Sequence, residues 1–147
     1  MKASTKETIK VIIADDHPLF RRGLKHALEE TSDIEVIGEA SNGDSLLSMI
    51  KSDNLDMVLL DISMPGKSGL DLLKQLKSEH SKLPILILSV YPEEQYAVRF
   101  IKAGASGYLT KESAAEKLAE AIRKIAAGGK YASTAVIEKL AFDFSDS

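Results

Sequence analysis

The stretch VIIADDHP, residues 11–18, carries the feature that decides the fold: an apolar run that ends in two adjacent carboxylates. Four consecutive apolar residues without polar alternation indicate a strand that is covered on both faces. Asp15 and Asp16 mark the point where the chain leaves this strand, and Pro18 suits the first turn of a helix. The segment therefore predicts a buried strand, a polar strand end and a following helix.

The same pattern of a strand followed by a helix recurs along the chain. Apolar runs of strand length occupy residues 9–14, 34–37, 57–60, 85–88 and 106–109. The segments between these runs have apolar residues at helical spacing. Buried strands that alternate with helices predict an α/β fold, a doubly wound five-stranded parallel sheet of flavodoxin-like order 2-1-3-4-5 with helices on both faces. In such a sheet the functional site lies at the carboxyl ends of the strands.

Composition favours one globular domain and excludes several classes of site. The 147 residues include 19 Lys plus Arg and 22 Asp plus Glu, a formal charge of −3 that gives no general attraction for nucleic acid or anionic membranes. The chain has no cysteine, which excludes disulfides, thiolate metal sites and cysteine nucleophiles. No apolar run reaches the roughly 18 residues of a membrane-spanning helix. The polar N-terminus does not have the pattern of a signal peptide, so we expect a cytoplasmic protein without membrane contact.

Three carboxylates are expected to converge at one edge of the sheet. Asp15 and Asp16 follow the first strand and Asp61 ends the third, and these strands are neighbours about 4.8 Å apart in the predicted order. At separations of about 5 Å and an effective dielectric constant of about 20, each pair repels by roughly 3 kcal/mol. A hard divalent cation relieves this repulsion, and Mg²⁺ is the cofactor that such oxygen ligands favour.

Two more polar residues fall at the same edge. Lys111 follows the fifth strand and adds one positive charge, while Ser89 ends the fourth strand and supplies a hydroxyl donor. A carboxylate can accept a phosphoryl group when a metal ion and a lysine neutralise the transferring oxygens. The sequence therefore predicts phosphoryl chemistry, with Asp61 as the central residue.

Four segments together resemble the receiver domain of two-component response regulators. They are ADDHPLFRRGL from Ala14, LLDISMPGKSGL from Leu59, ILS from Ile87 and KAGASGYLTK from Lys102. The resemblance covers residues 9–129, and the first and last segments are similar to the NarL/FixJ-type subgroup, whose output is LuxR-type. It implies a CheY-like signalling switch rather than an enzyme, phosphorylated by a sensor histidine kinase.

The resemblance implies a role for each acidic residue of the predicted site. Asp61 resembles the aspartate that becomes phosphorylated, and Asp15 and Asp16 resemble the acidic pair that holds Mg²⁺ together with it. The backbone carbonyl of Ser63 would complete the metal site. These roles are inherited from the family.

The resemblance also implies roles for three residues at the other strand ends. Lys111 matches the lysine that pairs with the phosphoryl group, Ser89 matches the hydroxyl residue that follows this group, and Tyr108 matches the aromatic switch residue. Glu112 departs from the pattern, because many receivers have proline after the lysine. A cis bond before a non-proline residue costs about 3 kcal/mol, so we expect either a trans bond or backbone strain there. Val90 and Ser63 also depart from the commonest residues, and they leave the lifetime of the acyl phosphate open.

Taken singly, each of these residues also has a structural interpretation. Asp15 and Asp16 suit a turn and helix cap before a proline. Ser89 suits a helix N-cap, and Tyr108 suits a half-buried aromatic in a sheet. An isolated lysine is usually just solvated. The joint position of these residues at one sheet edge is what favours a function.

The first expected helix carries residues to which we assign no chemistry. His17 is interpreted as a surface residue at the helix start, without a metal or phosphohistidine role. Arg21, Arg22 and Lys25 form a basic face that is either solvated surface or a docking site for a partner. The sequence leaves both interpretations open.

Other classes of function fit these residues less well. A phosphatase with an aspartyl nucleophile needs a second carboxylate two residues after Asp61, where Ser63 stands. A flavin or dinucleotide carrier needs a phosphate-binding loop where Asp15 and Asp16 would repel phosphate. An interaction module that is never phosphorylated would have no need of the acidic pocket.

The expected organisation is a flexible arm over residues 1–8, a receiver domain over 9–129, and a short helix with the start of a linker over 130–147. The resemblance implies a C-terminal helix-turn-helix domain outside this sequence, through which alone the protein would contact DNA and regulate transcription. The alternative is a stand-alone receiver that acts through protein–protein contacts. Phosphorylated receivers of this type often pair, so a homodimer formed on phosphorylation is expected.

Overall fold

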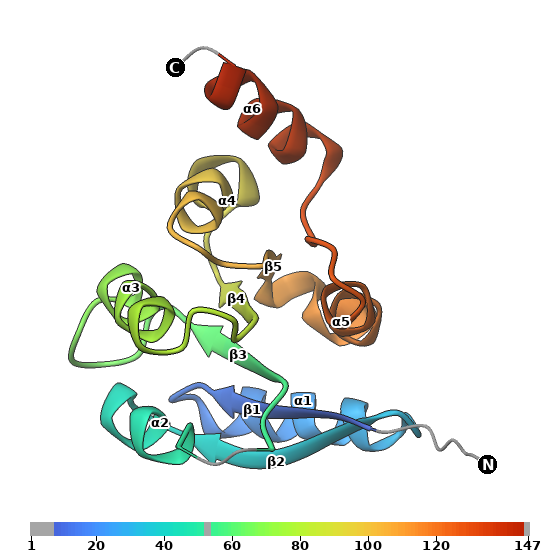
Figure 1. Cartoon of the computed structure of the whole chain (residues 1–147). Coiled ribbons are helices and arrows are strands. Elements are labelled where there is room, and N and C mark those ends of the chain that lie inside the picture. Colours follow the sequence, from blue (N-terminus) through green and yellow to red (C-terminus); the bar gives the residue numbers. More distant parts are fainter. Residues whose placement is uncertain (1–7, 52–53, 146–147) are drawn as a thin grey trace.

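Five parallel strands form one sheet in the order β2-β1-β3-β4-β5, which confirms the predicted α/β fold (Figure 1). The structure is a computed structural model, and it describes residues 8–51 and 54–145. The strands are β1 (Ile9–Ala14), β2 (Ile34–Ala40), β3 (Met57–Asp61), β4 (Ile85–Ser89) and β5 (Gly107–Thr110). The predicted N-terminal arm lies outside the described residues except for Thr8, whose hydroxyl donates to Glu35 Oε1 at 3.3 Å.

Six helices accompany these strands in the part of the chain that the structure describes. They are α1 (Pro18–Glu29), α2 (Gly43–Met49), α3 (Gly69–Glu79), α4 (Glu93–Lys102), α5 (Lys111–Ala126) and α6 (Thr134–Ser145). Helices α1 and α5 cover one face of the sheet, and α2, α3 and α4 cover the other (Figure 1). The three layers explain why the central strands lack polar alternation, since all five residues of β3 are buried.

The edge strand β2 is longer than the run at residues 34–37 predicts, because it extends to Ala40. Its added residues include Gly38 and Glu39, which break the apolar pattern. An edge strand is only partly covered, so polar residues are tolerated there and periodicity alone underestimates its length. In the sequence Leu19 lies at helical spacing with the apolar residues Leu24 and Leu28, which predicts a shared apolar face, but its side chain is 80% exposed.

Proline and glycine stand where the backbone starts a helix or turns, and the helix start at Pro18 agrees with the prediction. Pro18 occupies the first turn of α1, where its missing N–H has no helical partner. Gly66 has a φ of 97° in the turn after β3, and Gly128 has a φ of 99° just beyond α5. Positive φ values favour glycine, which has no Cβ to clash with the backbone. No helix in residues 8–51 and 54–145 has the length and apolar character to cross a membrane.

After α5 the chain turns back over β5 and α4. The backbone of Tyr131 pairs with β5, donating to Ser106 O at 3.0 Å and accepting from the amide of Tyr108 at 3.0 Å. The Ser133 hydroxyl then accepts from the Val136 amide at 3.2 Å, as expected for an N-cap. Figure 1 shows α6 beside α4, where Val136 and Leu140 are buried against the α4 side of the core. The C-terminal helix is therefore docked on the domain.

We predict that Val136→Asp undocks α6 without unfolding the sheet, because the substitution places a charge at a site only 3% exposed. Amides of residues 134–145 should exchange with solvent at least about tenfold faster, a loss of about 1.4 kcal/mol of local stability, while those of β1 and β3 stay protected. Hydrogen exchange followed by mass spectrometry measures this. Ala135→Asp, at an exposed neighbouring position, is the control and should leave exchange unchanged. Equal exchange in the two variants would show that α6 is not held by Val136.

Candidate functional site

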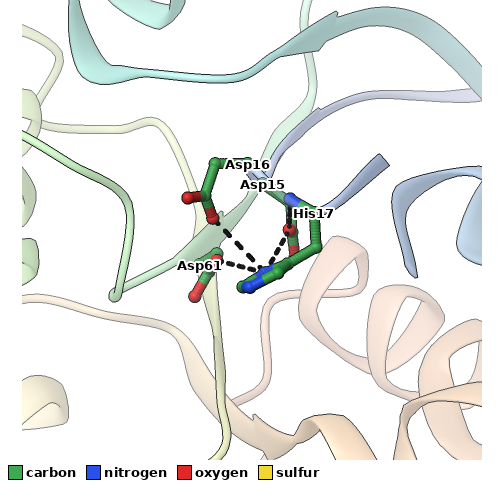
Figure 2. Close-up of side chains that lie close together, drawn as sticks. All are labelled: Asp15, Asp16, His17 and Asp61. Carbon is green, nitrogen blue, oxygen red and sulfur yellow. Dashed lines mark hydrogen bonds and ion pairs between the residues drawn. The ribbon is translucent and has the colours of Figure 1, made fainter. Parts of the chain in front are cut away.

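The carboxylates predicted from the sequence meet at the carboxyl ends of β1 and β3. These strands are paired in parallel, with Ala14 opposite Leu60, so the residues that follow them leave the sheet side by side. Asp15 is 0% and Asp61 is 1% exposed, whereas the Asp16 side chain is 29% exposed. One oxygen from each of the three carboxylates and a ring nitrogen of His17 lie within 4.8 Å of one another (Figure 2).

The two oxygens of Asp61 have different surroundings. Oδ1 accepts the backbone N–H of Ser63 at 3.0 Å and the Ser63 hydroxyl at 2.8 Å. Oδ2 lies 3.2 Å from the ammonium of Lys111. Ser63 therefore fixes the orientation of the carboxylate, and the second oxygen faces a cation.

Lys111 is the positive counterpart of the acidic pocket. Its Nζ lies 2.9 Å from Asp15 Oδ2 and 3.2 Å from Asp61 Oδ2, with the side chain only 10% exposed. The same ammonium lies 4.6 Å from the centre of the Phe20 ring, a favourable cation–π distance. Thr110 begins α5 by accepting the Ser113 amide at 3.4 Å, and this cap brings Lys111 to the pocket.

Charge in the pocket is not balanced by the residues that the structure describes around it. Three carboxylates face one ammonium, which leaves two negative charges uncompensated. Asp15 Oδ2 and Asp16 Oδ1 are buried atoms with no hydrogen-bond donor in satisfactory geometry, although Asp15 Oδ2 is ion-paired with Lys111. Buried carboxylate oxygens of this kind are the hard ligands that Mg²⁺ prefers, and a divalent ion would neutralise the remaining charge. The residues present therefore fit the expected cofactor.

Ser89 and Tyr108 are both buried, and both hold the loop between β4 and α4. The Ser89 hydroxyl accepts the Tyr91 amide at 2.9 Å, and the Tyr108 hydroxyl donates to the Tyr91 carbonyl at 2.9 Å. Burial raises the pKa of Tyr108, an effect partly offset by its hydrogen bond with Ser89. Ser89 is thus at the predicted edge, where its hydroxyl bonds the loop and not Asp61. A group that moved the Ser89 hydroxyl into a new hydrogen bond would release the Tyr91 amide.

Several contacts of the site went unforeseen in the sequence. His17 was predicted to be a surface residue without chemistry; its side chain is 59% exposed as predicted, but its ring nitrogen lies within 4.8 Å of an oxygen of each of the three carboxylates. Its position directly after two acidic residues was the available signal. Phe20 and Arg21 also support the pocket, the latter by donating to the Asp15 carbonyl. Phe20 and Arg21 stand three and four residues after His17, and this helical spacing could have indicated that they face the pocket.

The departures from the family pattern also have defined positions. No peptide bond in residues 8–51 and 54–145 is cis, so the bond before Glu112 is trans, one of the two expected outcomes. Val90 is 65% exposed beside the pocket edge. On the basic face of α1, Arg21 and Lys25 pair with Glu39 at 3.0 and 3.3 Å, whereas Arg22 is exposed.

Comparison with known proteins agrees with this geometry. A family model described as "Response regulator receiver domain" matches residues 11–123. The chain is 37% identical to the transcriptional regulatory protein DegU of Brevibacillus brevis over 84% of its own length and 52% of that protein. It is 38% identical to the nitrate/nitrite response regulator protein NarL of Escherichia coli, over 94% and 64% of the two lengths. The chain therefore spans about half to two thirds of the length of these relatives.

A solved structure is also similar. A LuxR-family two-component response regulator from Aurantimonas superimposes with a TM-score of 0.82 at 27% identity, covering 95% of this chain and 99% of the other. The relatives are thus NarL/FixJ/LuxR-family regulators, which confirms the resemblance noted in the sequence.

Removing one negative charge should change how the pocket responds to metal. We predict that, in the presence of a chelator, the free energy of unfolding of Asp16→Asn is about 1 kcal/mol higher than that of wild type. The substitution relieves the repulsion between the partly exposed Asp16 carboxylate and the carboxylates of Asp15 and Asp61. In wild type, Mg²⁺ at 100 times its Kd should add about 2.7 kcal/mol, and this increment should shrink in the variant. Thermal melts with and without Mg²⁺ measure both effects. Asp44→Asn, at an exposed position of α2, is the matched control. Equal Mg²⁺ responses in wild type and Asp16→Asn would contradict a metal site here.

Tyr108→Phe should reveal the raised pKa of this hydroxyl as a pH-dependent stability difference. Below the ordinary tyrosine pKa of about 10, the variant should be less stable than wild type by about 1 kcal/mol, since the bond to Tyr91 is lost. As the pH rises above about 10, the unfolded tyrosine ionises first and wild type loses this advantage. Denaturant unfolding at a series of alkaline pH values tests this. A difference that stayed constant with pH would argue against the burial effect.

Proposed function

The chain belongs to the response regulator receiver domain family, and from this membership we propose that Asp61 accepts a phosphoryl group from a sensor histidine kinase. The family is a signalling switch rather than a classical enzyme, and it implies a cognate histidine kinase. The observation that carries the proposal is the buried Asp61 carboxylate, held on one oxygen by Ser63 and faced on the other by Lys111. That arrangement presents an oriented carboxylate oxygen beside a cation.

The proposed transfer needs little other machinery. An oxygen of Asp61 forms a bond to phosphorus as the bond from phosphorus to the kinase imidazole breaks, and the leaving imidazole takes up a proton from solvent. Lys111, already within 3.2 Å of Asp61, pairs with a phosphoryl oxygen and stabilises its charge. Mg²⁺, held by Asp15, Asp16, Asp61 and the Ser63 carbonyl, supplies further neutralisation of the transferring oxygens when bound.

We propose that Ser89 and Tyr108 convert the new charge into movement. A phosphoryl oxygen on Asp61 is a stronger acceptor than a neutral group, so the Ser89 hydroxyl turns to donate to it and releases the Tyr91 amide. When Tyr91 moves, Tyr108 loses its acceptor and the start of α4 is freed. Taking a two-state switch from 1:99 to 99:1 requires about 5.5 kcal/mol. Hydrogen bonds to charged groups contribute about 1.5–3 kcal/mol each, so about two to four of them suffice.

For the output, we propose regulation of transcription by a helix-turn-helix DNA-binding domain beyond residues 9–129, which form the receiver unit. The transcriptional regulatory protein DegU of Brevibacillus brevis is nearly twice as long as its match to this chain, and this supports the proposal. A homodimer formed on phosphorylation and a cytoplasmic location accord with it. A stand-alone receiver that acts through protein contacts is the alternative.

We predict that acetyl phosphate with Mg²⁺ adds the mass of one phosphoryl group to the wild-type chain, and that Asp61→Asn abolishes this gain. Intact mass spectrometry measures the fraction modified. Asp44→Asn, an exposed acidic control, should be modified like wild type, and chelation of Mg²⁺ should strongly reduce modification. Equal modification of Asp61→Asn and wild type would show that another residue is the acceptor, and an unmodified wild type would refute the proposal.

A further inference from the structure

His17 places an imidazole nitrogen inside the acidic pocket. Its Nδ1 lies 3.3 Å from Asp15 Oδ1, 3.3 Å from Asp16 Oδ1 and 3.8 Å from Asp61 Oδ2 (Figure 2). The residue precedes α1 as its N-cap, but its side chain makes no capping hydrogen bond. The ring position is therefore not explained by helix capping, and it faces the carboxylates.

A cation already lies against this nitrogen. The Lys111 ammonium is 3.2 Å from His17 Nδ1, 2.9 Å from Asp15 Oδ2 and 3.2 Å from Asp61 Oδ2. In the tautomer that accepts from Lys111, Nδ1 presents its lone pair to a positive charge. One imidazole nitrogen and two carboxylate oxygens thus lie around the Lys111 ammonium.

The spacing of these atoms suits a small four-coordinate ion. Zn²⁺ binds imidazole nitrogen and carboxylate oxygen at about 2.0–2.2 Å in a tetrahedron, which puts neighbouring ligand atoms about 3.3–3.6 Å apart. The distances from Nδ1 to the three carboxylate oxygens lie in or near that range. Asp16 Oδ1 is a buried atom without a hydrogen-bond partner, and fully buried Asp15 contacts a cation, Lys111, through Oδ2, so Zn²⁺ would take the place of that ammonium beside the two carboxylates.

We propose that His17 allows the acidic pocket to bind a second kind of metal ion. Zn²⁺ would bind there through Nδ1 and the three carboxylates, in competition with Mg²⁺. Mg²⁺ has little preference for imidazole, whereas Zn²⁺ favours it and binds nitrogen and oxygen sites more tightly. Four protein ligands complete the tetrahedral shell of Zn²⁺ and leave no position for a phosphoryl oxygen. Zn²⁺ therefore blocks the phosphorylation that Mg²⁺ supports. The inference rests on the proposed function, because it uses the same acidic pocket.

His17→Ala tests the inference on the whole chain, and the absence of a capping bond makes it a mild substitution for the fold. Isothermal titration of wild type with ZnCl₂ and with MgCl₂ should give a Zn²⁺ affinity at least about tenfold higher. His17→Ala should lose at least about tenfold in Zn²⁺ affinity while keeping its Mg²⁺ affinity. His26→Ala removes an exposed histidine of the same helix away from the pocket, and it should bind both ions like wild type.

A direct readout of ligation accompanies the titrations. The chain has three histidines, so nitrogen NMR of histidine-labelled protein resolves each ring. One equivalent of Zn²⁺ should shift the Nδ1 resonance of His17 but not the resonances of His26 and His80. Zn²⁺ should also suppress acetyl phosphate labelling of wild type, and His17→Ala should require more Zn²⁺ for the same suppression.

The outcomes separate this inference from the proposed function. If Mg²⁺ binding and Mg²⁺-dependent labelling are normal, but His17→Ala binds Zn²⁺ as tightly as wild type or the Nδ1 resonance does not move, the role of His17 is refuted and the switch stands. If wild type neither binds Mg²⁺ nor becomes labelled, the proposed function fails, and the inference that rests on it fails too.

Discussion

Electrostatic repulsion among carboxylates brought together by parallel strand ends is the constraint on which the rest of this structure depends. Asp15 directly follows β1 and Asp61 ends the neighbouring strand β3, and both are almost wholly buried, where water screens their charges poorly. Lys111 compensates part of the charge, and Ser63 holds one Asp61 oxygen in place. The remaining negative charge suits the pocket to a divalent ion, and the phosphoryl transfer that we propose depends on that ion.

A short series of hydrogen bonds runs from the end of β4 through β5 to the segment before α6. The Ser89 hydroxyl accepts from the Tyr91 amide, and the Tyr108 hydroxyl donates to the Tyr91 carbonyl. The amide of Tyr108 in turn donates to the carbonyl of Tyr131. Beyond Tyr131 the chain enters α6, whose docking on α4 is reinforced by the ion pair between Lys102 and Asp143 at 2.9 Å. The Tyr91 loop and the docked helix α6 are therefore joined through β5 by a few hydrogen bonds.

The sequence predicted the buried strands of the fold well and the partly exposed edge strand less well. Strands such as β3 are recognisable because burial on both faces imposes an unbroken apolar run. The end of β2 was missed because an edge strand accepts Gly38 and Glu39 without penalty. The prediction for Leu19 was wrong because helical spacing identifies a face but not its limits, and this residue of the first turn of α1 is exposed.

By itself, the sequence determined the strand order, the edge of the sheet that carries function, and the convergence of Asp15, Asp16 and Asp61, because these follow from periodicity and parallel topology. Tertiary structure alone decided which atoms meet. That the Ser89 hydroxyl bonds Tyr91, and that the His17 ring lies among carboxylates, depends on side-chain rotamers and on neighbours distant in the chain. Residue spacing carries no information about those choices, because they are set by packing and by the local electric field once the fold has formed.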